Sequence, residues 1–266
     1  MTIQQFQKVI WQYYKERARV FPWRKTRDPY LILVSEMMLQ QTQTHRVVPK
    51  FEAFVKEFPS FEALAHAPLK KVLTLWQGLG YNRRALYLKR TAEVILREHA
   101  GKLPRNTEQL VQLPGVGSYT AGAIRVFAFD EPAVFIETNI RAVFLYFFFP
   151  KKQSVPDSAL LPLIKRSLPT KRVREWYSAL MDYGAMLKQK ISNPSQRSLH
   201  YYKQSTFKGS FREKRAGVLR AILAGARRKT IPKTLALSPT DAERCLRSLE
   251  KEGLLKRKGA EYTLTS

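Results

Sequence analysis

The hydrophobic positions of this chain recur mostly at helical spacing. Apolar residues three and four positions apart predict amphipathic or buried helices over most of the first 190 residues, while the alternation typical of strands is rare. Short connectors that contain Pro and Gly separate the segments. The pattern therefore predicts a mainly α fold, with helices at 3–17, 30–43, 45–57, 61–65, 69–76, 83–99, 107–112, 118–128, 137–148, 158–167 and 171–187.

The pattern changes near residue 188. The stretch "LKQKISNPSQRSLHYYKQSTFKGSFREKR" has few aliphatic residues and predicts an irregular connector. Beyond it, helices are expected at 212–225, 230–237 and 238–255, the last with Ser238 as N-cap and Pro239 in its first turn, followed by a hairpin that turns at Lys258-Gly259. Three helices and a hairpin resemble a winged helix-turn-helix, so residues 206–266 are predicted to be a second domain.

The strongly positive net charge of the chain indicates an anionic binding partner. The 266 residues contain 47 Lys and Arg against 21 Asp and Glu, a net charge of +26, and the segment from Lys203 to Lys233 has only Glu213 as an acid. A surplus of this size favours a polyanion, and nucleic acid is the strongest candidate because its phosphates bind cations with release of counterions. No stretch is apolar enough to span a bilayer and the start is not a secretory signal, so an intracellular, cytoplasmic protein without membrane contact is expected.

Cysteine and histidine usage argues against a metal site. Cys245 is the only cysteine, which excludes a disulfide within the chain and a cluster ligated by several cysteines. The four histidines are far apart in the sequence and lack the spacing of ligands. We therefore expect no bound metal.

The strongest local signal is "LPGVGSYTAGA", residues 113–123. A short helix is expected to end, Gly115, Val116 and Gly117 to form a tight turn, and a new helix to begin at Ser118. Glycine lets the backbone approach a ligand closely, and the first N–H groups of a helix bind phosphate oxygens. This pattern resembles the helix-hairpin-helix of DNA repair proteins, which holds the DNA backbone.

Two isolated carboxylates are placed in apolar surroundings. Glu36 lies within "PYLILVSEMMLQQTQ", and Glu137 lies within "EPAVFIETNIRAVFLYFFFP". Burial disfavours the charged form of a carboxyl group and can keep it protonated near neutral pH. Beside a phosphate-binding hairpin, two such groups indicate general acid–base chemistry.

Four motifs together resemble the endonuclease III superfamily, with the MutY-type adenine DNA glycosylases as the closest branch. They are "PWR…PYLILVSEMMLQQTQ", "LTLWQGLGYNRRALYLKRTA", "LPGVGSYTAGAI" and "ALMDYGAM", and the resemblance covers roughly residues 1–187. It implies a two-lobed helix-hairpin-helix DNA glycosylase fold over residues 1–205. Residues 22–130 would form a barrel lobe, and residues 1–21 with 131–205 the second lobe.

The resemblance also implies roles for single residues. Enzymes of this family flip a nucleotide out of the duplex and break the bond between base and sugar. Glu36 matches the residue that protonates the departing adenine, Glu137 the carboxylate that stabilises the charge developing on the sugar, and Asn139 a polar residue that supports this site. Tyr119 occupies the position where bifunctional relatives carry a lysine that cleaves the strand through a Schiff base. A phenol cannot do this, so base removal alone is expected.

DNA contacts are implied at two further places. Gln40, Gln41 and Thr42 belong to one motif and Tyr81 to another, and the family's counterparts of Gln41 and Tyr81 enter the duplex. With the hairpin at Gly115, Val116, Gly117 and Ser118, these residues form the expected DNA-binding set.

The sequence departs from the family in three respects. Glu137 replaces the usual Asp and is one methylene longer. The four cysteine positions of the family's iron–sulfur cluster fall near Lys188, Ser195, Ser198 and Gln204, so no cluster and no other cofactor is expected. The tail is too short for the Nudix-like domain that helps adenine glycosylases to recognise 8-oxoguanine.

Three functions stay open. The leading one is a monofunctional, monomeric adenine DNA glycosylase of base excision repair that acts on adenine opposite 8-oxoguanine or guanine in double-stranded DNA. The second is a glycosylase of the same fold for thymine or uracil opposite guanine, or for hypoxanthine. The third, a non-catalytic protein that binds DNA structure, is disfavoured by Glu36, because a pure binder has no use for an isolated buried acid.

Overall fold

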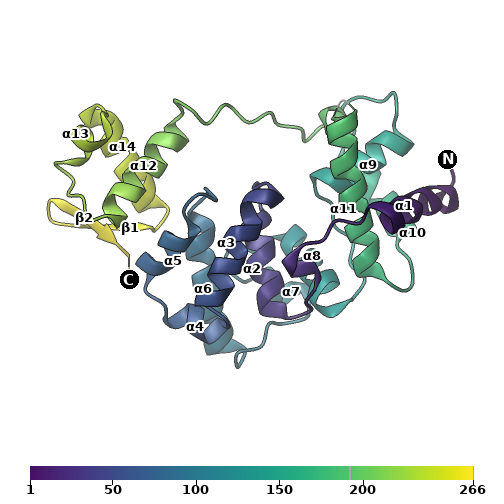
Figure 1. Ribbon diagram of the computed structural model, residues 1–266, viewed down its shortest axis with the longest axis horizontal. Coiled ribbons are helices and arrows are strands. Elements are labelled where there is room, and N and C mark those ends of the chain that lie inside the picture. The colour runs from purple at the N-terminus through teal and green to yellow at the C-terminus, as the bar shows by residue number, and fades with distance from the viewer. Residues whose placement is uncertain (192, 266) are drawn as a thin grey trace. The chain divides into compact units, whose positions relative to one another are not determined.

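The computed structural model describes residues 1–191 and 193–265 and is mainly helical (Figure 1). Ser192 and Ser266, which fall in the predicted connector and hairpin, lie outside the described residues. The chain forms two compact units, residues 1–36 with 103–203 and residues 37–102 with 204–266. The predicted division into residues 1–205 and 206–266, with lobes at 22–130 and at 1–21 plus 131–205, stays a prediction.

The first unit is built around the long helix α11. Its helical elements are α1 (Ile3–Arg17), η1 (Pro22–Arg24), the first part of α2 (Pro29–Leu39), α7 (Thr107–Leu110), α8 (Ser118–Phe129), α9 (Thr138–Phe148), α10 (Asp157–Ser167), α11 (Val173–Lys190) and η2 (Pro194–Arg197). Helices α1 and α9 both pack against α11. Phe6 of α1 meets the rings of Phe144 and Trp176 at centroid distances of 5.1 and 5.8 Å, which forms an aromatic core.

Helices α9 and α11 approach each other very closely at Gly184. A Cβ atom at this position would lie 2.3 Å from the backbone oxygen of Asn139, so only glycine fits there. The contact holds the start of α9, and with it Glu137 and Asn139, against the middle of α11.

The second unit contains four helices from residues 37–102 and the C-terminal elements. The helices are α3 (Thr44–Glu57), α4 (Phe61–His66), α5 (Leu69–Trp76) and α6 (Arg83–Glu98), followed later in the chain by α12 (Phe211–Leu223), α13 (Ile231–Leu235), α14 (Pro239–Lys251), β1 (Leu255–Lys258) and β2 (Glu261–Leu264). The strands pair in antiparallel fashion with Lys258 opposite Glu261. Ser238 caps α14 by accepting from the Asp241 N–H, as expected from the sequence.

Several boundaries differ from those predicted. The helix predicted at 238–255 ends at Lys251, and Leu255 begins β1 instead. The helix predicted at 107–112 ends at Leu110.

Three further differences concern α2, α11 and the β-hairpin. Helix α2 ends at Leu39 instead of residue 43, because the next residues turn and Gln41 adopts a positive φ of 53°. Helix α11 runs to Lys190, three residues into the predicted connector, and Pro194–Arg197 adds a short 3-10 helix there. The hairpin turns one residue later than expected, at Gly259-Ala260, where Gly259 has a φ of 58°.

No helix among the described residues is long and apolar enough to cross a membrane. The three C-terminal helices and the hairpin have the order of a winged helix-turn-helix, and their assignment to that class stays a prediction.

Candidate active site

Helix α2 carries Glu36 into the protein interior. Asp28 begins the helix, since its carboxylate accepts the Tyr30 N–H at 2.8 Å and its carbonyl accepts the Ile32 N–H at 3.0 Å. From Ile32 to Met38 every residue is buried, so the helix is apolar on all sides apart from Ser35 and Glu36. The Glu36 residue is only 5% exposed.

Tyr119 is the polar partner of Glu36. It lies in the first turn of α8, and its hydroxyl donates to Glu36 Oε2 at 3.1 Å. Burial raises the pKa of the Tyr119 phenol well above its ordinary value, and the charges of Glu36 and Glu137 raise this pKa further. The phenol is therefore a neutral donor at every physiological pH. Phe135 packs edge-on against its ring at 5.6 Å between centroids.

Burial also raises the pKa of Glu36, from 4.5 to about 7. The Tyr119 hydrogen bond lowers this pKa, the nearby charge of Glu137 raises it, and Arg24 lowers it least. At neutral pH a large fraction of Glu36 is therefore protonated, in contrast to an ordinary surface glutamate.

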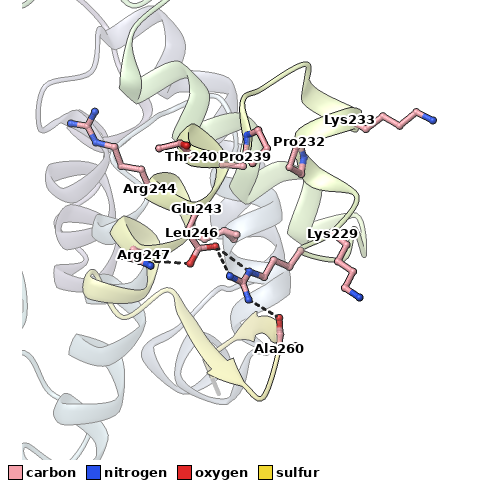
Figure 2. Close-up of a pocket in the computed structure, with 12 residues that line it drawn as sticks. Lys229, Pro232, Lys233, Pro239, Thr240, Glu243, Arg244, Leu246, Arg247 and Ala260 are labelled. Carbon is pink, nitrogen blue, oxygen red and sulfur yellow. Dashed lines mark hydrogen bonds and ion pairs between the residues drawn. The ribbon is translucent and has the colours of Figure 1, made fainter.

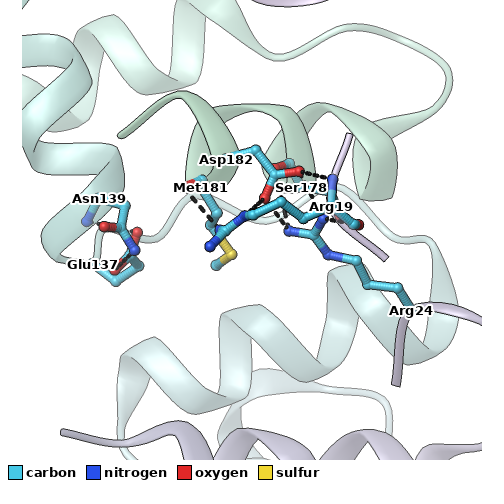
Figure 3. A network of polar contacts seen from close by, with 7 residues as sticks. All are labelled: Arg19, Arg24, Glu137, Asn139, Ser178, Met181 and Asp182. Carbon is cyan, nitrogen blue, oxygen red and sulfur yellow. Dashed lines mark hydrogen bonds and ion pairs between the residues drawn. The ribbon is translucent and has the colours of Figure 1, made fainter. Parts of the chain in front are cut away.

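Arg24 cannot hold Glu36 in its charged form because its own charge is already paired. Asp182, whose side chain is fully buried, accepts hydrogen bonds from both terminal nitrogens of Arg24 at 2.8 Å and from Nε of Arg19 at 2.7 Å (Figure 3). The Arg19 backbone N–H adds a fourth contact at 2.9 Å. This network also fastens the segment that precedes α2 to α11.

Glu137 is the N-cap of α9. Its Oε1 accepts the N–H groups of Asn139 and Ile140, each at 2.8 Å, and its Oε2 accepts Asn139 Nδ2 at 3.2 Å. Both oxygens thus act as acceptors, and the positive end of the helix dipole faces the group. Figure 3 shows Glu137 and Asn139 side by side at the start of this helix. Glu36, Tyr119, Glu137 and Asn139 all belong to the first unit, and the charge of Glu137 acts on both Glu36 and Tyr119.

The predicted hairpin of the helix-hairpin-helix motif, at residues 115–118, joins α7 to α8. Gly115 has a φ of 75°, which favours glycine, whereas Gly117 has a φ of −90° and no atom within 4 Å of an added Cβ. Gly117 and Ser118 are exposed, while Val116 is buried and uses its N–H within the turn, donating to Leu113 O at 3.1 Å. Helix α8 begins at Ser118, and the backbone N–H groups of Ser118 and Tyr119, which precede the first hydrogen bond of the helix, are suited to bind a phosphate.

The remaining predicted DNA contacts, residues 40–42 and Tyr81, lie in the second unit, where Tyr81 ends a second short segment, residues 78–81. Gln41 and Tyr81 both have positive φ, 53° and 46°, a conformation that non-glycine residues seldom adopt and that is frequent at functional sites. Thr42 joins the segments, because its hydroxyl donates to Leu79 O at 3.2 Å. Gln40 accepts at its backbone oxygen from Arg84.

Arg84, a residue that the sequence did not single out, holds these two segments together. Its guanidinium is buried and donates to six acceptors at 2.6–3.3 Å, and its Nε donates more weakly to a seventh, Tyr81 O, at 3.4 Å. The six are the backbone oxygens of Met37, Met38, Gln40, Leu79 and Gly80 and the hydroxyl of Thr42. Burial lowers the Arg84 pKa to about 10, so the side chain is charged at neutral pH. The signal available in the sequence was its place inside the "GLGYNRRALYLK" motif.

The residues at the predicted cluster positions do not fit an iron–sulfur cluster. None is a cysteine, and the polar groups of two of them have other partners: Ser195 donates to Thr138 O at 3.0 Å, and Ser198 accepts the His200 N–H at 3.1 Å. Lys188 is partly buried near Glu137; burial lowers the pKa of its amine, and Glu137 opposes that shift. Gln204 donates to the Tyr81 hydroxyl.

Comparison with known proteins agrees with this geometry. The family model described as "HhH-GPD superfamily base excision DNA repair protein" matches residues 34–161, a range that includes Glu36, Tyr119 and Glu137. An adenine DNA glycosylase of Buchnera aphidicola subsp. Baizongia pistaciae is 33% identical over 194 residues, which cover 73% of this chain and 55% of that protein. The chain thus spans about half the length of that relative.

In matches to two thymine glycosylases, the aligned region covers a larger share of the other protein. A thymine/uracil-DNA glycosylase of Methanothermobacter thermautotrophicus is 31% identical over 185 residues, which cover 68% of this chain and 84% of that protein. The solved structure of a thermostable thymine-DNA glycosylase is 28% identical, with a TM-score of 0.63, and the match covers 74% of this chain and 96% of the other.

Proposed function

Since the chain belongs to the HhH-GPD superfamily of base excision DNA repair proteins, we propose that it is a monofunctional DNA glycosylase that removes adenine paired with 8-oxoguanine or guanine. The observation that carries the proposal is the buried Glu36, whose pKa is raised to about 7 beside Tyr119 and Glu137. The adenine glycosylases among the relatives support the choice of adenine.

The proposed reaction uses the two carboxyl groups differently. With Oε2 of Glu36 bonded to the Tyr119 hydroxyl, the acidic proton resides on Oε1 and is transferred to the adenine ring. The bond between the base and C1′ of the sugar breaks, and the electron pair leaves with the protonated adenine. The Glu137 carboxylate stabilises the positive charge on the sugar until a water oxygen bonds to C1′, and the proton that this water loses returns to the Glu36 carboxylate.

The product is an abasic site in an intact strand. A strand break through a Schiff base needs an amine nucleophile, and Tyr119 supplies a neutral phenol in its place.

We also propose that the protein binds no iron–sulfur cluster, because the four corresponding positions lack thiolates and the hydroxyls of Ser195 and Ser198 have other hydrogen-bond partners. Metal analysis of the purified protein tests this.

Double-stranded DNA with a mismatched or damaged pair is the proposed partner, bound by a monomer. Gly117, Ser118, Gln41 and Tyr81 are exposed or half-buried, as contact with DNA requires. The proposed place of action is the cytoplasm, at a bacterial nucleoid, or another intracellular place that contains DNA.

A second candidate is a glycosylase for thymine or uracil opposite guanine. The match to the thymine/uracil-DNA glycosylase supports this candidate, because it covers 84% of that protein, whereas the match to the Buchnera adenine glycosylase covers only 55%.

One experiment separates the candidates. Duplexes with adenine opposite 8-oxoguanine, adenine opposite guanine, thymine or uracil opposite guanine, and hypoxanthine are incubated with the protein and then treated with alkali, which cleaves the strand at abasic sites. Adenine release is expected. Release of thymine or uracil alone would contradict the proposal, and release of no base would contradict both candidates.

The substitution Gly117→Ala tests whether the hairpin between α7 and α8 binds the DNA backbone. The folded protein has room for the methyl group and the φ of −90° suits alanine, so the free energy of unfolding is expected to stay within about 0.5 kcal/mol of the wild type. Affinity for DNA is expected to fall several-fold and equally for all sequences, because the methyl group separates the backbone from the phosphate. Chemical denaturation and fluorescence anisotropy measure the two quantities. Unchanged affinity would exclude Gly117 from the interface.

A further inference from the structure

A groove in the C-terminal part of the second unit has no role in the reaction proposed above. It has a volume of about 1040 Å³ and lies between α13, α14 and the turn of the hairpin (Figure 2). Pro232, Ala242 and Leu246 contribute apolar surface to it. Its charged lining residues are Arg228, Lys229, Lys233, Glu243, Arg244 and Arg247. Five cations against one carboxylate make the groove strongly positive.

The single carboxylate is neutralised from within the protein. Glu243 accepts from Arg228 at 3.0 Å, from Arg247 at 3.3 Å and from the Tyr262 hydroxyl at 3.4 Å. Arg228 also donates to Ala260 O at 3.3 Å, which ties the loop before α13 to the hairpin turn. Arg228 and Glu243 are therefore structural, and repulsion between Glu243 and an anionic ligand is small.

The other lysines and arginines of the groove lie on α14, on α13 and just before α13. Thr240, Arg244 and Arg247 are exposed at positions i, i+4 and i+7 of α14, so they share one face. Lys229 and Lys233 are exposed as well, and Figure 2 shows both side chains extending outward. Helix α14 has 13 residues and is thus about 20 Å long. An α-helix with its side chains is about 10–12 Å in diameter, which the major groove of DNA, about 12 Å wide, admits.

We propose that this groove is a second DNA-binding surface, which takes the phosphate backbone of undamaged duplex DNA. Lys229, Lys233 and Arg244 bind phosphates, and Arg228 with Glu243 holds the loop that carries Lys229 into α13. The charge of the whole segment fits this occupant, since residues 204–266 contain 15 Lys and Arg against six Asp and Glu. Binding here requires no flipped base and no catalysis, so the inference stands apart from the proposed glycosylase activity.

The test measures the affinity of the full-length protein for an undamaged duplex at several salt concentrations. The double variant Lys229→Ala/Lys233→Ala removes two exposed cations that the fold does not need. The slope of log affinity against log salt is negative, and each lost phosphate contact reduces its magnitude by about 0.9. The slope is therefore expected to become shallower by about 2, together with weaker binding at low salt.

The matched control is Lys8→Ala/Arg220→Ala, which removes the same charge from exposed positions on α1 and α12 outside the groove. Its slope is expected to stay close to that of the wild type. A slope for the groove variant equal to that of the wild type or of the control would overturn the proposal, and would leave an acidic protein segment as the better occupant. Because the duplex contains no target base, failure of the glycosylase proposal would not affect this result.

Discussion

Glu36→Gln is expected to abolish base release while leaving DNA affinity within a few-fold of the wild type. The amide has the size of the carboxyl group but cannot donate an acidic proton, and general acid catalysis contributes about 10²–10⁴-fold to such reactions. The hairpin at residues 115–118, which is proposed to bind phosphate, is untouched by the change. Single-turnover rates with adenine opposite 8-oxoguanine and anisotropy with the same duplex measure the two effects.

The same variant is expected to alter how stability depends on pH. The pKa of Glu36 is about 7 in the folded protein and near 4.5 when the chain is unfolded, so the folded state binds the extra proton between these values. Stability due to this group is therefore fully present below pH 4.5 and is lost as the pH rises toward 7. Relative to Glu36→Gln, the wild type should lose roughly 2–3 kcal/mol between about pH 5 and pH 8.

Glu62→Gln serves as the control, because Glu62 is an exposed glutamate in the first turn of α4. It is expected to retain full activity and to follow the pH dependence of the wild type. If Glu36→Gln released adenine at a rate near that of the wild type, Glu36 would have no part in the chemistry.

Arg84→Met is expected to destabilise the protein by about 3 kcal/mol or more. The change leaves the carbonyls of Met37, Met38, Gln40, Leu79 and Gly80 without their donor, and each buried acceptor left unpaired costs about 1–3 kcal/mol. Without this anchor, Gln41 and Tyr81 are also expected to leave their positive-φ conformations. Urea denaturation measures the stability.

Arg83→Met is the matched control, since Arg83 is the exposed neighbour of Arg84 and the change removes the same charge. It should cost less than about 0.5 kcal/mol. Arg84→Lys should fall between the two, because an ammonium group keeps the charge but has fewer donors than a guanidinium. Equal stability of Arg84→Met and Arg83→Met would show that the Arg84 contacts do not hold the two segments.

The sequence predicted the helices best where local signals were complete. The predicted ranges 3–17 and 69–76 match α1 and α5, and α1 begins with a capping box between Thr2 and Gln5. Helix α2 was predicted too long because its apolar run gives no stop signal at Leu39. The left-handed turn at Gln41 is stabilised by Arg84, which is more than 40 residues away in the sequence.

The candidate site was also only partly predictable, because some of its contacts join residues that are far apart in the sequence. Glu36 and Glu137 were found because an isolated charge in an apolar run is visible in the sequence itself. Arg84 donates mainly to backbone carbonyls, which every residue has, and Asp182 pairs with arginines about 160 positions earlier. Such partners are set by the tertiary fold and leave no local pattern.

The most direct test of the account is the pH dependence of single-turnover adenine release from DNA that is already bound. The proposed mechanism makes the protonated form of Glu36 the active one, and its pKa is about 7, so the rate should be level at low pH and fall about tenfold per pH unit above 7. The predicted result is one falling limb with its midpoint near pH 7. A rate that stays constant or rises between about pH 6 and pH 9 would contradict the assignment of Glu36 as the acid.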